Sequence, residues 1–165
     1  MALSKIDAAN FLTGTIPSGN IATSSLAAAA TGKVLQVVQG TTSTPVDHST
    51  SSYADTGLSA SITPSSSSNK VLVMVQQHSF VSGNNGGSVK ILRGSTAIYT
   101  PVETYGISAD GLSIDFRNYH SFSYLDSPSS TSALTFKTQA RAYNITFKTQ
   151  PNSFTSFITL MEIVG

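Results

Sequence analysis

The sequence predicts an all-β protein, an antiparallel β-sandwich (jelly-roll-like) that follows an extended N-terminal arm. Three observations support this fold class. After Gly32, apolar residues recur at every second position, which is the period of strands. Clusters of Gly, Pro, Asn, Asp and Ser interrupt the pattern about every ten residues, as in sandwiches and barrels. No amphipathic segment of useful length has the 3.6-residue period of a helix.

The predicted strands begin directly after Gly32. Residues 33–39 (KVLQVVQ) form the first strand, and residues 41–50 form a polar edge strand or a loop, because Pro45 removes a backbone donor. Residues 57–63 (GLSASIT) alternate, and residues 70–80 (KVLVMVQQHSF) form a long apolar strand. The later strands are expected at residues 88–93, 96–102, 116–125, 133–143, 145–149 and 155–164.

Two turn signals predict hairpins. The segment SGNNGG at residues 82–87 combines Asn and Gly, which tolerate positive φ, so the strands on either side of it should pair. A second hairpin is expected between residues 133–143 and 145–149. Residues 103–115 are the least regular part of the chain and form either an exposed loop or a small insertion.

Two of the strands are apolar on both faces. Val71 and Val73 alternate with Leu72 and Met74, and the last strand carries Phe157, Met161 and Ile163 opposite a second apolar set. Strands with one solvated face should alternate between apolar and polar residues, so a further layer must cover them. The sequence leaves two candidates for that layer: a second subunit, or the arm or a loop of the same chain. We expect a subunit interface, with these residues in it: Val71, Val73, Phe157, Met161 and Ile163.

The N-terminal segment has a different pattern. Large apolar residues fall at every fifth position, with Ser, Thr, Ala, Gly and Asn between them: Ile6, Phe11, Ile16, Ile21 and Leu26. A five-residue period fits neither a strand nor a helix, and five such repeats cannot bury a core alone. Residues 1–32 are therefore expected to be an arm that binds a partner, and residues 33–165 the sandwich domain.

Composition excludes several classes of function. Charged residues make up 10% of the chain and the net charge is +1, which gives no basic surface for nucleic acid. No run of about 18 apolar residues is present, so membrane insertion is not expected. The chain lacks Cys, and its three histidines lie far apart, so neither a metal site nor a cofactor is expected: His48, His78 and His120.

Catalytic motifs are also missing from the sequence. It holds no nucleophile elbow, phosphate-binding loop or zinc-protease helix, and nothing pairs two carboxylates as a glycosidase requires. Tyrosines and acidic residues in the irregular segment offer a possible receptor surface for sugars, with these members: Tyr99, Tyr105, Asp110 and Asp115. The alternative is that the tyrosines are strand residues with one solvated end. Glu162 stands alone in an apolar strand, where it pairs with Lys33 or Lys70 or lines a symmetry axis.

Several sequence blocks together resemble a family of small structural virion proteins of tailed phages, of the kind found in cyanophages and other marine phages. The blocks are FLTGTIPSGNI (11–21), TGKVLQVVQ (31–39), GLSASITPSSSSNKVLV (57–73), LRGSTAI (92–98), SYLDSP (123–128) and ITLMEI (158–163). Such proteins are described as tail-fibre-like or structural and are typically homotrimers. The resemblance implies no catalytic residues.

The resemblance implies a protein of the virion, assembled in the host cytoplasm. The expected role is a short trimeric fibre whose arm docks on tail, neck or capsid proteins and whose sandwich contacts the host surface, including its glycans. The apolar residues of the arm would then bury in the trimer stem or the docking surface. A capsid decoration or cement trimer is the second expectation, and a carbohydrate-active enzyme is the third.

Overall fold

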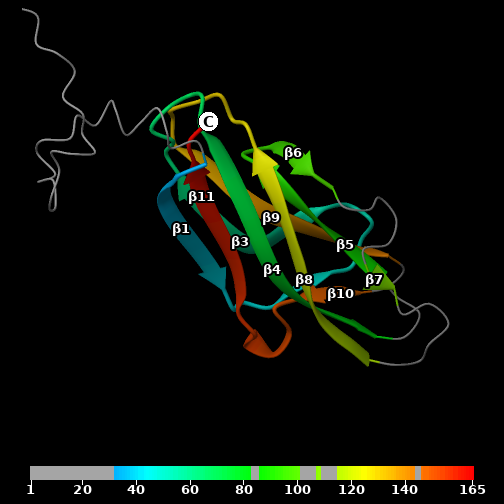
Figure 1. The fold of residues 1–165 in the computed structure, drawn as a ribbon. Helices are drawn as coiled ribbons and strands as arrows, with labels where there is room; N and C mark the ends of the chain where they lie inside the picture. The colour runs from blue at the N-terminus through cyan, green and yellow to red at the C-terminus, as the bar shows by residue number, and fades with distance from the viewer. Residues whose placement is uncertain (1–31, 83–85, 101–106, 109–114, 144–145) are drawn as a thin grey trace, which may run out of the picture.

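The computed structural model describes residues 32–82, 86–100, 107–108, 115–143 and 146–165, which form two packed antiparallel sheets (Figure 1). The predicted β-sandwich is confirmed. The residues of the arm that are predicted to dock, Ile6 to Leu26, lie outside the described residues. The described part of the chain begins where Gly32 donates a backbone hydrogen bond to Val164, beside the end of the last strand.

The first sheet, sheet A, is six-stranded in the described residues. Its main strands run in the order β1 (Val34–Thr42), β11 (Ser156–Ile163), β4 (Lys70–Ser82) and β8 (Asp115–Asp126). Two short strands, β10 (Phe147–Thr149) and β2 (Val46–His48), extend it beside the end of β4. Because β8 pairs along β4 over its whole length, β10 and β11 share the opposite edge of β4, separated by the 3₁₀ turn η2 (Pro151–Ser153).

The second sheet, sheet B, contains β3 (Ala54–Ile62), β9 (Leu134–Tyr143), β5 (Gly86–Arg93) and β6 (Thr96–Tyr99) in that order, and the two-residue strand β7 (Ile107–Ser108) pairs with β5. Among the described strands, eight have four or more residues. Numbered one to eight along the chain, they stand in the order one–eight–three–six in sheet A and two–seven–four–five in sheet B. This is the strand order of a jelly roll.

Both predicted hairpins are wrong, because the strands that follow each other belong to different sheets. β4 lies in sheet A and β5 in sheet B, and β9 and β10 are separated in the same way. The polar segment after the first strand resolves into the end of β1, a loop through Pro45 and the edge strand β2. The chain therefore reverses where the turn chemistry indicates, but it crosses the sandwich when it does so.

The core lies between the sheets and is built from alternate residues of each strand. The larger cluster includes Val71, Val73 and Val75 of β4 together with Leu58, Ile62, Ile91, Phe136, Ile158 and Leu160. A smaller cluster surrounds Phe147 at the end near β10. Val71 and Val73 are fully buried within one chain, so their assignment to a subunit interface is wrong. Phe157, Met161 and Ile163 point to the opposite face of the same sheet, where they are partly exposed.

A buried hydrogen-bond network of polar side chains adds to this interior. Thr56 Oγ1 lies 2.6 Å from Thr138 Oγ1, which donates to Gln77 Oε1 at 2.9 Å. Gln77 Nε2 donates in turn to Ser156 Oγ at 3.0 Å. These side chains are fully buried and come from both sheets. Because buried polar groups are costly unless paired, the network fixes how the two sheets are aligned.

Candidate functional site: the outer face of sheet A

A row of aliphatic side chains crosses the outer face of sheet A. Backbone register places Val37 of β1 opposite Met161 of β11, Met161 opposite Leu72 of β4, and Leu72 opposite Leu125 of β8. Val37 is 56% exposed and Leu125 is 48% exposed. We call these residues, Val37, Met161, Leu72 and Leu125, the aliphatic row. It confirms that β4 and β11 are apolar on both faces.

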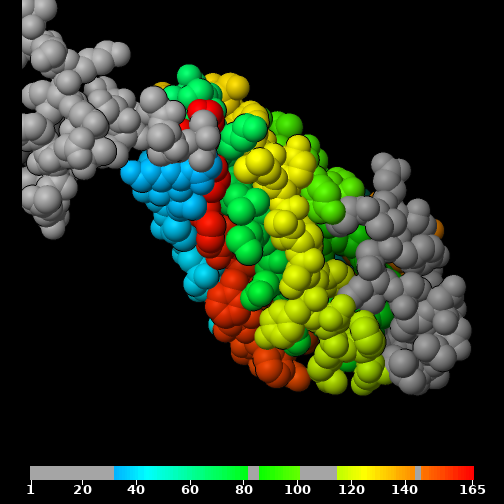
Figure 2. All heavy atoms as spheres, in the orientation of Figure 1, coloured from blue at the N-terminus to red at the C-terminus, as the bar shows by residue number. Residues whose placement is uncertain are grey.

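The aliphatic row continues toward the start of β1 and toward the middle of β4. Val34 and Leu35 are exposed at the start of β1, and Ile163 of β11 lies partly exposed opposite Val34. On the other side of the row, Met74 is 43% exposed. Figure 2 shows this face as four adjacent stripes, β1, β11, β4 and β8. The four strands of the aliphatic row are about 4.8 Å apart, so the row forms an apolar strip roughly 20 Å long across the sheet.

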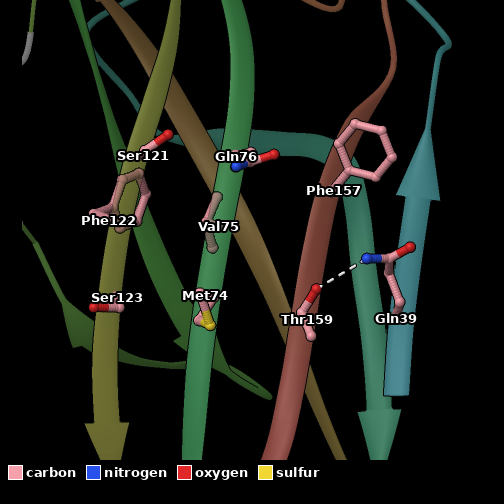
Figure 3. A pocket seen from close by; sticks show the side chains of 9 residues that line it. All are labelled: Gln39, Met74, Val75, Gln76, Ser121, Phe122, Ser123, Phe157 and Thr159. Atoms are coloured by element: carbon pink, nitrogen blue, oxygen red, sulfur yellow. Dashed lines mark hydrogen bonds between the residues drawn. The ribbon is translucent and has the colours of Figure 1, made fainter. Parts of the chain in front are cut away.

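A groove of about 520 Å³ lies next to the aliphatic row on the same face (Figure 3). Register places two further rows of residues here: Gln39, Thr159, Met74 and Ser123, then Thr41, Phe157, Gln76 and Ser121. The small side chains on β8 leave the space, and Phe157 and Met74 supply its larger apolar surfaces. We call this space the hydroxyl–amide groove.

The hydroxyl–amide groove is uncharged. Of the described residues that line it, none is acidic or basic. Gln39 Nε2 donates to Thr159 Oγ1 at 3.1 Å, as Figure 3 shows. The side chains of Gln76, Ser121 and Ser123 make no hydrogen bond to any described residue, so their polar groups are available to a ligand or to solvent.

Aromatic side chains close the far end of this face. His78 of β4 lies between Tyr119 of β8 and Phe154, which follows η2, with ring centroids 4.6 Å from each. His78 is 5% exposed, and within the described chain its Nδ1 has no hydrogen-bond partner. Burial, with a smaller contribution from the Arg117 charge, lowers the pKa of His78. The neutral form of the imidazole is therefore favoured under the two rings.

The predicted receptor surface is only partly described. Tyr99 of β6 is half-buried, and its ring centroid lies 5.7 Å from those of Phe122 and Tyr124 of β8, so it packs at the margin of the core rather than on an open surface. Asp115 is exposed at the start of β8. Tyr105 and Asp110 lie outside the described residues. Of the four residues, the structure therefore places two, Tyr99 in sheet B and Asp115 in sheet A.

Metal-binding geometry is not found in the described part of the chain. No three His, Cys, Asp or Glu residues there are grouped so that they could hold a metal ion. Burial lowers the pKa of His120 to about 4, and its Nε2 lies 2.8 Å from Ser79 Oγ. His48 approaches Thr149 Oγ1 at 3.3 Å, so these two histidines are partnered inside the sandwich. No helix among the described residues is long and apolar enough to cross a membrane.

Glu162 has a structural role that the sequence does not reveal. It is 1% exposed and faces the loop between β3 and β4, not Lys33 or Lys70. Its carboxylate accepts hydrogen bonds from Gln36 Nε2 at 2.6 Å, from Ser65 N and Oγ at 2.6 and 2.7 Å, and from Asn69 Nδ2 at 2.5 Å. Burial alone would raise the pKa of Glu162, but these donors lower it to about 2. The carboxylate thus anchors the loop as an anion.

Comparison with known proteins adds no family. No protein-family model matches the chain, and no curated protein is significantly similar to it. The functional argument therefore depends on the outer face of sheet A and on the sequence itself.

Proposed function

We propose that the protein is a structural component of a phage virion, a short trimeric fibre whose sandwich domains associate through the outer face of sheet A. The observation that carries the proposal is the aliphatic row, which leaves large apolar side chains of four strands in solvent. The sequence blocks that resemble virion proteins and the five-residue pattern of the arm support the same role. In this role the arm docks on another virion protein and the sandwich is displayed toward the host surface.

The energy available from the aliphatic row is consistent with assembly that needs more than one contact. Burying the exposed part of each side chain contributes about 1 kcal/mol, which gives roughly 4 kcal/mol per protomer and 12 kcal/mol per trimer. A trimer forms in two association steps, and each step costs ~4–15 kcal/mol in lost translational and rotational freedom. The row alone therefore makes a marginal trimer, and further contacts from the arm stabilise it.

Absolute mass tests this proposal. Light scattering on the full chain at micromolar concentration should give three times the monomer mass of 17.2 kDa. The double substitution Val37→Asp with Leu125→Asp places charges in the proposed interface, where they would be buried without partners, and should give the monomer mass. Ser59→Asp, at an exposed position on β3 of sheet B, is the matched control and should leave the trimer intact. A wild-type monomer, or a double variant that stays trimeric, contradicts the proposal.

A capsid decoration or cement trimer is the second candidate. The same aliphatic row and arm would serve it. Labelling the protein in purified particles distinguishes the two roles. A cement protein should be present in copies that match the capsid lattice, whereas a fibre should be confined to the tail or neck.

A further inference from the structure

We propose that the hydroxyl–amide groove of sheet A binds a neutral saccharide. This inference names a ligand for the displayed sandwich, so its biological setting depends on the proposed function, although the binding reaction does not. The outer face divides into two zones of different chemistry. The aliphatic row suits another protein surface, and the groove beside it combines an aromatic ring with amides and hydroxyls.

The larger apolar surfaces of the groove match one side of a sugar ring. Phe157 stands partly exposed on β11, and Met74 is exposed on the adjacent strand β4. Figure 3 shows the Phe157 ring on one side of the groove and Met74 below it. A pyranose ring has an apolar C–H face that packs on such surfaces. Small-molecule sites are typically lined by apolar groups with a few polar groups that fix orientation.

The polar groups of the groove match the hydroxyl groups at the edge of a sugar ring. Amide and hydroxyl side chains both donate and accept hydrogen bonds, as sugar hydroxyls do. Gln76 on β4 and Ser121 and Ser123 on β8 have no hydrogen-bond partner among the described side chains, and they stand on adjacent strands. If another protein covered them with an apolar surface, these groups would be desolvated without partners. A ligand rich in hydroxyl groups satisfies them.

The absence of charge among the described lining residues indicates a neutral ligand. The nearest basic residues on this face of β4 and β8 are Lys70 and Arg117, which the register places four residues from Met74 and from Gln76 respectively. Four residues of a strand span about 13 Å. The carboxylate of an acidic sugar would therefore lose its hydrating water in the groove, and no cation would stabilise its charge in place of that water. The volume of about 520 Å³ leaves room for a short oligosaccharide.

The experiment measures glycan binding and mass on the same sample of the full chain. A panel of neutral oligosaccharides built from glucose, galactose and mannose is titrated by NMR or calorimetry, and oligouronates serve as the acidic comparison. We expect at least one neutral oligosaccharide to bind and the uronates not to bind. Phe157→Ala should weaken binding about tenfold and Gln76→Ala about fivefold, both without a change in mass.

Two further variants locate the site and separate it from assembly. Ser121→Phe fills the groove and should abolish binding, while circular dichroism and mass confirm that the protein remains folded and assembled. The Val37→Asp, Leu125→Asp protein should keep its affinity per chain even when it is monomeric, because the aliphatic row lies outside the groove. Absence of binding to every neutral sugar by an intact trimer overturns this inference and leaves the proposed assembly unaffected. Binding that survives Ser121→Phe places the site elsewhere and overturns it too.

Discussion

Replacing Glu162 by Gln tests the buried anion that holds the β3–β4 loop. Gln has nearly the same shape, but it presents an NH₂ group to donors that now face a carboxylate oxygen. Gln36 Nε2 would then meet another donor, and turning the Gln36 amide would break its bond to Thr63 O, which is 2.8 Å long. We therefore expect a folded but less stable protein.

The expected magnitude follows from the pKa of Glu162. Its value falls from 4.5 to about 2 in the folded protein, and each unit corresponds to about 1.36 kcal/mol, so the anion contributes about 3 kcal/mol near pH 7. A group with a lowered folded pKa stabilises the protein above the unfolded pKa, and this contribution is lost as pH falls from 4.5 toward 2. Glu162→Gln should therefore cost about 3 kcal/mol at neutral pH, roughly 10 °C in melting temperature, and progressively less in acid.

Urea denaturation followed by circular dichroism at pH 7, 5, 4 and 3 measures this difference, with all samples at one protein concentration because assembly shifts apparent stability. Asp47→Asn is the control, since Asp47 and Lys148 form an exposed ion pair at 3.2 Å and should contribute little. A stability difference between wild type and Glu162→Gln that is the same at every pH would refute the reasoning, because it would show that the lost contribution does not depend on the carboxylate charge.

Two further predictions concern packing and the buried histidine. Gly40→Ala should destabilise the fold by about 1 to 3 kcal/mol, because a Cβ at Gly40 would meet the backbone carbonyl of Ser59. Thr41→Ala, at the exposed neighbouring position, is the control and should have little effect. Equal melting temperatures for the two variants would contradict this prediction. The wild type should lose stability as pH falls from 6.5 toward 4, because the folded protein resists protonation of His120. In His120→Gln, whose side chain can still form a hydrogen bond with Ser79, the free energy of unfolding measured in urea should change less over this pH range. An unchanged pH dependence would assign the loss of stability to other groups.

The sequence predicts which residues share one face of a strand better than it predicts which strands pair with each other. Alternation in residues 70–75 correctly separates Val71 and Val73 from Leu72 and Met74, but it does not say which set faces the core. The turn at residues 82–87 predicts that the chain reverses and does not distinguish a hairpin from a crossing between sheets. Both ambiguities have one cause: local patterns fix the direction of side chains, whereas pairing is decided by residues distant in the sequence.

The candidate site shows the same limit. The sequence predicts Phe157 in a subunit interface, but the groove depends on the register of four strands, which brings Gln39 of β1 beside Thr159, 120 positions away. Glu162 is a similar case, because its donors at Gln36 and Ser65 are 126 and 97 residues distant. No motif in the sequence links such pairs. The pairing of all the strands must be known before the groove or the hydrogen bonds of Glu162 can be predicted.

The pairing of β1 with β11 has a consequence for how the protein is made. The first strand of the jelly roll finds its partner in the last, so sheet A cannot close until residues 156–163 have been synthesised. Chains dominated by such distant pairings fold slowly, in milliseconds to seconds, because loop closure precedes the contacts that reward it. During synthesis, at about 5–20 residues per second, β1 emerges seconds before its partner exists. Until β11 has been made, the apolar residues of β1, Val34, Leu35 and Val37, and its backbone hydrogen-bonding groups lack the strand that pairs with them.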